Sequence, residues 1–181
     1  SKMFLFCMRS AKSLPDNHPI KKIFRTYTER GLAQASVRDQ DLLLYLANLL
    51  VEFMWIENLY GKTIDGKRLE SLIDILVRAN EAGDQARGDY YRHLGDYSLF
   101  MLGMFPEYIA RSRRALSPSW YQDTGRIGYQ IAGELEKNLW RTQVFRKLAD
   151  KFDRCVVTLN WVREYSTDPF YQLMFREFGI S

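Results

Sequence analysis

Two stretches of this sequence place side chains capable of acid–base or anion-binding chemistry at helical spacing. In the first stretch His93 and Asp96 are three residues apart, so they share one face of a helix. Arg92 and Tyr97 are their neighbours in the sequence. The second stretch supplies four more polar residues on or near one helix face: Tyr121, Asp123, Arg126 and Tyr129. Together the eight residues form a candidate binding site for a small anionic molecule. The alternative is a buried polar network or a surface ion-pair group, because Asp and Arg are mostly exposed unless paired.

No catalytic signature accompanies these residues. The sequence has no Walker-type phosphate loop, no GxGxxG, no HExxH and no EF-hand loop. His18 and His93 are the only histidines, which excludes a metal site built on several histidines. Cys7 and Cys155 lie far apart, which excludes a disulfide framework and a zinc site built on cysteines. We therefore assign no catalytic residue, no metal and no cofactor; the missing motifs favour a protein that is not an enzyme, and an enzyme stays open as an alternative.

The two polar stretches fall on helices expected at 85–104 and 118–139. The second of these holds three glycines, each of which costs about 1 kcal/mol relative to alanine in a helix interior. They are Gly125, Gly128 and Gly133, and the first helix has small residues of its own at Gly95, Ser98 and Gly103. A close crossing of the two backbones would offset this cost and gather the polar residues. The alternative is a kink or a loop at Gly125 or Gly128.

Apolar spacing and turn residues predict the remaining helices. Further helices are expected at 20–34, 41–60, 67–81 and 142–165, with a short basic piece at 106–116 and a terminal helix from 168. Ser117 followed by Pro118 indicates a cap and first turn, and Thr142 is expected to cap the helix that follows. The helix over 118–139 is expected to turn these residues inward: Ile127, Ile131, Leu135 and Leu139.

The stretch Asp41–Tyr60 organises the expected fold. Fifteen of its twenty residues are apolar or aromatic, almost all round a helix, which favours a position inside the protein. Ser36 and Asp39 both suit its N-terminus. A membrane span is the weaker interpretation, because polar and acidic residues interrupt the apolar run. The sequence therefore predicts an all-α fold, a single-domain bundle of seven or eight helices around this buried helix. The domain covers residues 1–181, with 1–19 as a loose arm in one alternative.

Composition and charge limit the class of protein and the cellular compartment that can be expected. With 181 residues, of which 46% are hydrophobic and 27% charged, a single soluble domain is expected. No signal peptide is expected, and the two unpaired cysteines fit a reducing cytoplasm. Residues 1–38 carry eight Lys or Arg against two acids, a net charge of +6, whereas residues 39–181 carry −2. Such asymmetry can indicate a basic arm for nucleic acid, or only the solvated face of a helix.

One pattern suggests relatives. The segment LGDYSLFMLGMFPE (94–107), followed by WYQDTGRIGYQIAGEL (120–135), resembles uncharacterised bacterial all-helical proteins of unknown function. The resemblance implies a bacterial origin. It supplies no functional residue and no named family.

Three functions remain open from the sequence. The first is a cytoplasmic binding or scaffolding protein that recognises a protein partner and forms a homodimer, because aromatics are 14% of the chain and are enriched at interfaces. The second is a protein or enzyme that binds a small anionic ligand in the cluster between 85–104 and 118–139. The third is nucleic-acid binding by the basic N-terminal segment, aided by the arginines at 111–114.

Overall fold

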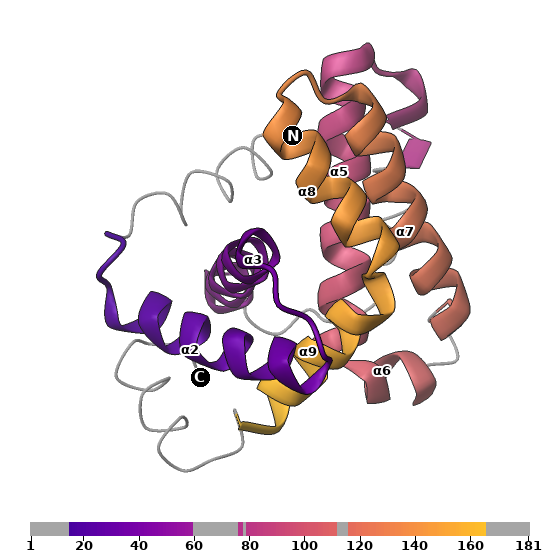
Figure 1. Ribbon diagram of the computed structural model, residues 1–181. Coiled ribbons are helices and arrows are strands. Elements are labelled where there is room, and N and C mark those ends of the chain that lie inside the picture. The colour runs from indigo at the N-terminus through magenta and orange to yellow at the C-terminus, as the bar shows by residue number, and fades with distance from the viewer. Residues whose placement is uncertain (1–14, 60–75, 78, 112–115, 166–181) are drawn as a thin grey trace. The chain divides into compact units, whose positions relative to one another are not determined.

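The computed structural model describes residues 15–59, 76–77, 79–111 and 116–165. Every regular element in these ranges is a helix, which confirms the all-α fold class (Figure 1). The chain divides into two compact units, which we describe separately. Unit 1 comprises Ser1–Lys62 with Val157–Ser181, and unit 2 comprises Thr63–Val156. The expected single domain over 1–181 stays a prediction.

Some expected features lie outside the described residues. They are most of the N-terminal arm (1–14), most of the helix expected at 67–81, the two arginines Arg113 and Arg114, and the terminal helix from 168. Residues 76–77 and 79–81 are helical, in agreement with the expected end of the 67–81 helix.

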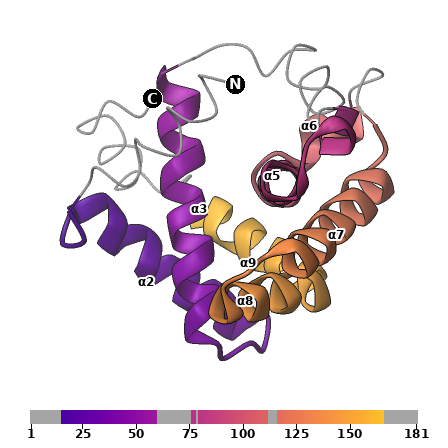
Figure 2. The ribbon, with the colours of Figure 1, turned by 90° about the horizontal axis from the view of Figure 1, so that it is seen from above.

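Unit 1 contains α2 (Pro19–Gln34) and α3 (Gln40–Leu59), which pack against each other (Figure 2). The last residues of α9 (Phe152–Tyr165) also belong to this unit. Gly31 of α2 lies against α9, because a Cβ at this position would be 2.8 Å from the Thr158 carbonyl oxygen. In α3 Leu42, Leu46 and Leu50 have no exposed surface, as expected of a core helix.

The connection between α2 and α3 shows which of the two candidate residues, Ser36 and Asp39, begins α3. Ser36 has a φ of 58°, and the neighbouring N–H groups of Ser36 and Val37 donate to carbonyls of the last turn of α2. This is a left-handed residue ending a helix, so Ser36 terminates α2 and does not begin α3. Asp39 caps α3, because its Oδ1 accepts the backbone N–H groups of Asp41 at 3.0 Å and Leu42 at 3.2 Å.

Unit 2 contains α5 (Asp84–Met104), α6 (Pro106–Arg111), α7 (Pro118–Leu135) and α8 (Leu139–Asp150). Helix α7 packs against both α5 and α8. The Ser117 side chain caps α7 by accepting the Trp120 N–H at 3.2 Å, and Pro118 occupies the first turn, as predicted. Residues 94–104 of α5 are buried without interruption, so this half of the helix is enclosed on all sides.

The boundary between α7 and α8 differs from the sequence prediction. Helix α7 ends at Leu135 rather than at 139, because the carboxylate of Glu136 accepts the N–H groups of Lys137 and Asn138 and Glu136 itself is extended. The Asn138 side chain then caps α8. Thr142 is therefore not a cap but a residue inside α8, whose hydroxyl donates to the Glu136 carbonyl at 3.2 Å.

The helix expected at 142–165 is likewise two helices, α8 and α9. Lys151 departs from helical geometry with φ −109° and ψ 23°, although hydrogen bonds from Lys151 to Lys147 and from Cys155 to Lys151 continue across it. The boundary is thus one residue with non-helical dihedral angles within an almost continuous helical segment. No glycine or proline marks it in the sequence.

The buried face of α7 also differs from the prediction. Ile127 and Leu139 were expected to point inward, yet 49% of Ile127 and 81% of Leu139 are exposed. The buried face consists instead of small residues and two tyrosines: Tyr121, Gly125, Gly128, Tyr129, Ala132 and Gly133. The close approach of neighbouring helices at the glycines decides which face is covered, and side-chain hydropathy does not.

Candidate functional site

The crossing of α5 and α7 positions most of the predicted polar residues. A Cβ on Gly128 would be 2.6 Å from the Tyr91 carbonyl oxygen and 2.9 Å from the Gly95 nitrogen, so the two backbones touch at this point. A Cβ on Gly95 would lie 2.8 Å from the ring of Tyr129. A Cβ on Gly125 would overlap the Phe152 ring. The predicted close crossing is confirmed for Gly125 and Gly128, whereas Gly133 faces α8.

Asp96 and Tyr129 form the polar contact at the centre of this crossing. The Tyr129 hydroxyl donates to Asp96 Oδ1 at 2.7 Å, and both residues are buried. The Tyr129 ring stacks on Phe145, with centroids 6.3 Å apart and planes inclined by 15°. A buried hydrogen bond between the two helices favours one register of α5 against α7. This structural role is enough to account for Asp96 and Tyr129 without a ligand.

His93 lies one turn before this pair on α5. Although part of its surface reaches solvent, protein atoms crowd the imidazole, and its ring is 6.5 Å from that of Tyr97. Burial and, secondarily, the positive charge of Arg92 lower the pKa of His93 to about 3. The ring is therefore neutral near pH 7 and would not carry a proton in acid–base chemistry there.

Tyr121 is fully buried at the other end of the crossing. Burial and the neighbouring Tyr108 raise the pKa of Tyr121 to about 12. Among the residues that the structure describes, the Tyr121 hydroxyl has no hydrogen-bond partner, and the same is true of the Ser98 hydroxyl. A phenol held neutral and enclosed in this way is part of the core.

Asp123 and Arg126 turn toward solvent instead. Asp123 is exposed, and Arg126 forms an ion pair of 2.9 Å with Asp153 at the start of α9. Gln122 donates a short hydrogen bond to the same carboxylate. These two predicted residues are thus on the outer side of α7, whereas Asp96 and Tyr129 are inside the crossing. The structure does not gather all eight residues into one pocket, and their role as a ligand site stays a prediction.

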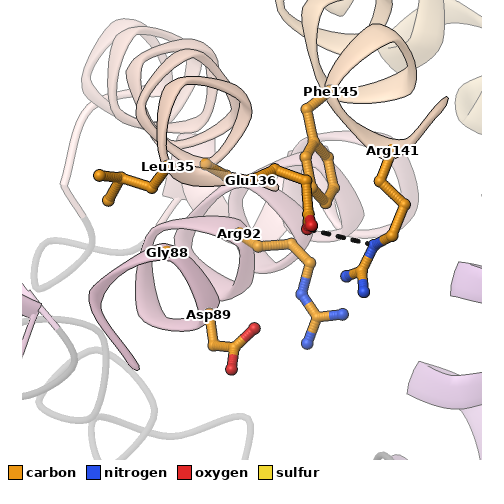
Figure 3. A pocket seen from close by; sticks show the side chains of 8 residues that line it. Gly88, Asp89, Arg92, Leu135, Glu136, Arg141 and Phe145 are labelled. Atoms are coloured by element: carbon orange, nitrogen blue, oxygen red, sulfur yellow. Dashed lines mark ion pairs between the residues drawn. The ribbon is translucent and has the colours of Figure 1, made fainter. Parts of the chain in front are cut away.

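A small hollow lies beside the crossing, where α5, α7 and α8 meet (Figure 3). Its cavity volume is about 10 Å³, close to the space of one water molecule. It is lined by Gly88, Asp89, Arg92, Ala132, Leu135, Glu136, Arg141 and Phe145. Of the predicted site residues only Arg92 is among them. The other lining residues were not predicted. Asn138 is the one signal in the sequence that bears on them, because as a cap it places Arg141 in the first turn of a helix.

No protein-family model matches the sequence, and no curated protein or solved structure resembling it was found. This agrees with the sequence analysis, which attached no named family to the patterns at 94–107 and 120–135.

In the described ranges no three His, Cys, Asp or Glu side chains are grouped so that they could hold a metal ion. Within the same part of the chain, no helix combines the length and apolar character that a transmembrane span requires.

Proposed function

We propose that this chain is a helical protein-binding module whose first partner is a second copy of itself. The observation that carries the proposal is the exposure of Leu139 and Trp140, consecutive residues at the start of α8. Leu139 is 81% exposed and Trp140 is 55% exposed. Large exposed apolar side chains, particularly tryptophan, are typical of interaction surfaces.

The surroundings of this pair suit a two-fold contact. Glu134 and Lys137 are exposed on the preceding turn, so the rim carries both charges within four residues. In a dimer with two-fold symmetry the same patch meets itself, and opposite charges on one rim can pair across the axis. Leu139 and Trp140 would then form the apolar centre, and further surface would be needed to reach the roughly 800 Å² per partner of a standard interface.

The hollow does not favour an enzyme. Substrate pockets usually enclose about 300–1,000 Å³, whereas this hollow has a cavity volume of about 10 Å³. His93 is neutral near pH 7, and Asp96 accepts a hydrogen bond from Tyr129. These observations support a binding role over chemistry at the crossing. A cytoplasmic location, a bacterial origin and nucleic-acid binding by the basic segment stay predictions.

Sedimentation velocity at micromolar concentration tests the proposal. The parent should sediment with the mass of two chains, and a Leu139→Ser/Trp140→Ser double variant with the mass of one. The variant should still fold, with the helical circular dichroism spectrum of the parent, because these side chains are exposed in the single chain; its melting temperature should fall only by the stabilisation that dimerisation gives the parent. Ile127→Ser is the matched control: it removes a half-exposed apolar residue of α7 outside the pair and should leave the dimer intact. A parent that sediments as a single chain, or a double variant that still dimerises, refutes the proposal.

A further inference from the structure

Two arginines from different helices meet at the hollow between α5, α7 and α8. Arg92 belongs to α5 and Arg141 to α8, and Figure 3 shows both guanidinium groups directed toward the same opening. Gly88 of α5 and Leu135 of α7 stand at the rim, and an added Cβ on Gly88 would be 3.4 Å from the Leu135 Cβ. The helices are thus close together behind the two cationic groups.

Arg141 is held in place without using its whole hydrogen-bonding capacity. Its Nε lies 3.3 Å from Oε2 of Glu136, and its guanidinium carbon lies 5.7 Å from the centre of the Phe145 ring. Glu136 is itself fixed, because its other oxygen accepts the N–H groups of Lys137 and Asn138. Figure 3 shows that the ion pair with Glu136 is made by Nε of Arg141 and not by its two terminal nitrogens. The arginine is therefore oriented before any ligand arrives.

We infer that this hollow binds a single carboxylate group between Arg92 and Arg141. Planar guanidinium groups recognise a carboxylate through paired N–H donors, and two of them directed at one opening supply the donors for both oxygens. The first turn of α8 adds the positive end of a helix dipole near Arg141. The hollow itself has a cavity volume of about 10 Å³, close to the space of one water molecule, so the carboxylate would lie at its opening against the guanidinium groups and not inside it. The inference is independent of the proposed dimer, because neither arginine is part of the Leu139–Trp140 pair.

Asp89 should oppose binding of a carboxylate, in contrast to the two arginines. Its side chain also lines the hollow, three residues before Arg92 on the same helix face. A carboxylate in the opening would be repelled by it. Replacing Asp89 by Asn should therefore tighten binding, whereas loss of either arginine should weaken it.

The carboxylate could belong to a small organic acid or to the acidic side chain of a peptide, so the experiment uses both. Acetate is titrated into the ¹⁵N-labelled full chain while the arginine Nε–H signals are followed by NMR. A peptide of alternating leucine and glutamate is then compared with its glutamine counterpart. Saturable shifts with acetate, and no tighter binding of the acidic peptide, indicate a small acid. Tighter binding of the acidic peptide than of acetate, with loss of binding in the glutamine form, indicates an acidic protein segment.

Four variants decide whether the hollow is responsible. Arg92→Gln and Arg141→Gln should each weaken binding about tenfold or more, since each removes charged hydrogen bonds. Arg141→Lys keeps the charge and should also weaken binding, because the planar fork is lost. Asp89→Asn should bind several times more tightly. The matched control is Arg146→Gln, which removes an exposed arginine of α8 outside the hollow and should leave binding unchanged.

The outcomes separate this inference from the proposed dimer. Linear, non-saturating shifts with acetate and the peptide, or unchanged affinity in the arginine variants, overturn the carboxylate site. Acetate titration of the Leu139→Ser/Trp140→Ser variant, which is expected to be a single chain, should give the parent affinity. Failure of the dimer would appear in sedimentation alone.

Discussion

Gly128 is the position where the packing of α5 against α7 can be tested most directly. An alanine in a helix interior usually stabilises a helix by about 1 kcal/mol relative to glycine. Here the added Cβ would be 2.6 Å from the Tyr91 carbonyl oxygen and 2.9 Å from the Gly95 nitrogen. In an α-helix these two groups are hydrogen-bonded to each other, so the methyl group would press on a backbone hydrogen bond that cannot turn aside.

The sign of the effect follows from these distances. An ordinary contact of a Cβ begins near 3.4 Å, so the helices must separate by several tenths of an ångström along their whole contact. Overpacking of this kind costs about 1–3 kcal/mol, and the gain in helix propensity offsets about 1 kcal/mol of it. Gly128→Ala should therefore destabilise unit 2 by up to about 2 kcal/mol, and Gly128→Leu by more.

Gly133→Ala is the matched control in the same helix. Its Cβ would be 3.4 Å from the Phe145 Cβ and 3.6 Å from the Thr142 carbonyl oxygen, both ordinary contacts, so this variant should be as stable as the parent or more so. Urea unfolding followed by circular dichroism compares the parent with the Gly128→Ala, Gly128→Leu and Gly133→Ala variants. If Gly128→Ala is at least as stable as Gly133→Ala, the backbones do not touch at Gly128 and the described crossing is wrong.

Three further predictions concern single hydrogen bonds, backbone strain and pH. Tyr129→Phe removes the hydrogen-bond donor to buried Asp96 and should cost about 1.5–3 kcal/mol of unfolding free energy. Tyr121→Phe removes a buried hydroxyl that has no partner among the described residues, so this variant should be as stable as the parent or more stable. Equal losses of unfolding free energy in urea would contradict this prediction. Ser36→Gly should stabilise the protein by about 1 kcal/mol, because φ is 58° there and glycine adopts that conformation without strain; a lower melting temperature would count against it. The pKa of His93 falls from 6.5 to about 3 on folding, so the unfolded chain binds more protons between these values. The contribution of the neutral His93 ring to the unfolding free energy is complete above pH 6.5. It is lost as the pH falls toward 3, and the unfolding free energy then decreases by at most about 1.4 kcal/mol per pH unit. Between pH 6.5 and 5 the parent should therefore lose more unfolding free energy than His93→Gln, and parallel losses would refute the prediction.

The sequence by itself determined the fold class and the start of most helices. Local signals were sufficient here, because caps and prolines act on the backbone within a few residues: Asp39 and Ser117 begin α3 and α7 as predicted. The glycines of the 118–139 stretch also predicted a close crossing, since each glycine inside a helix needs a compensating contact.

Only the tertiary structure decided which faces are covered. Ile127 is half exposed and Tyr129 is buried, the reverse of what side-chain hydropathy suggests, because α5 approaches α7 where glycines leave room and Asp96 satisfies the tyrosine hydroxyl. The end of α7 depends on Glu136, whose carboxylate captures backbone N–H groups that hydropathy does not register.

The candidate sites show the same division. His93 and Asp96 were found from their spacing on one helix, but the low pKa of His93 arises from the atoms that surround it in the folded chain. Arg92 and Arg141 are 49 positions apart in the sequence and come together only because α7 and α8 fold back beside α5. Spacing along a chain determines which side chains share a helix face, whereas the packing of helices determines which of those faces meet.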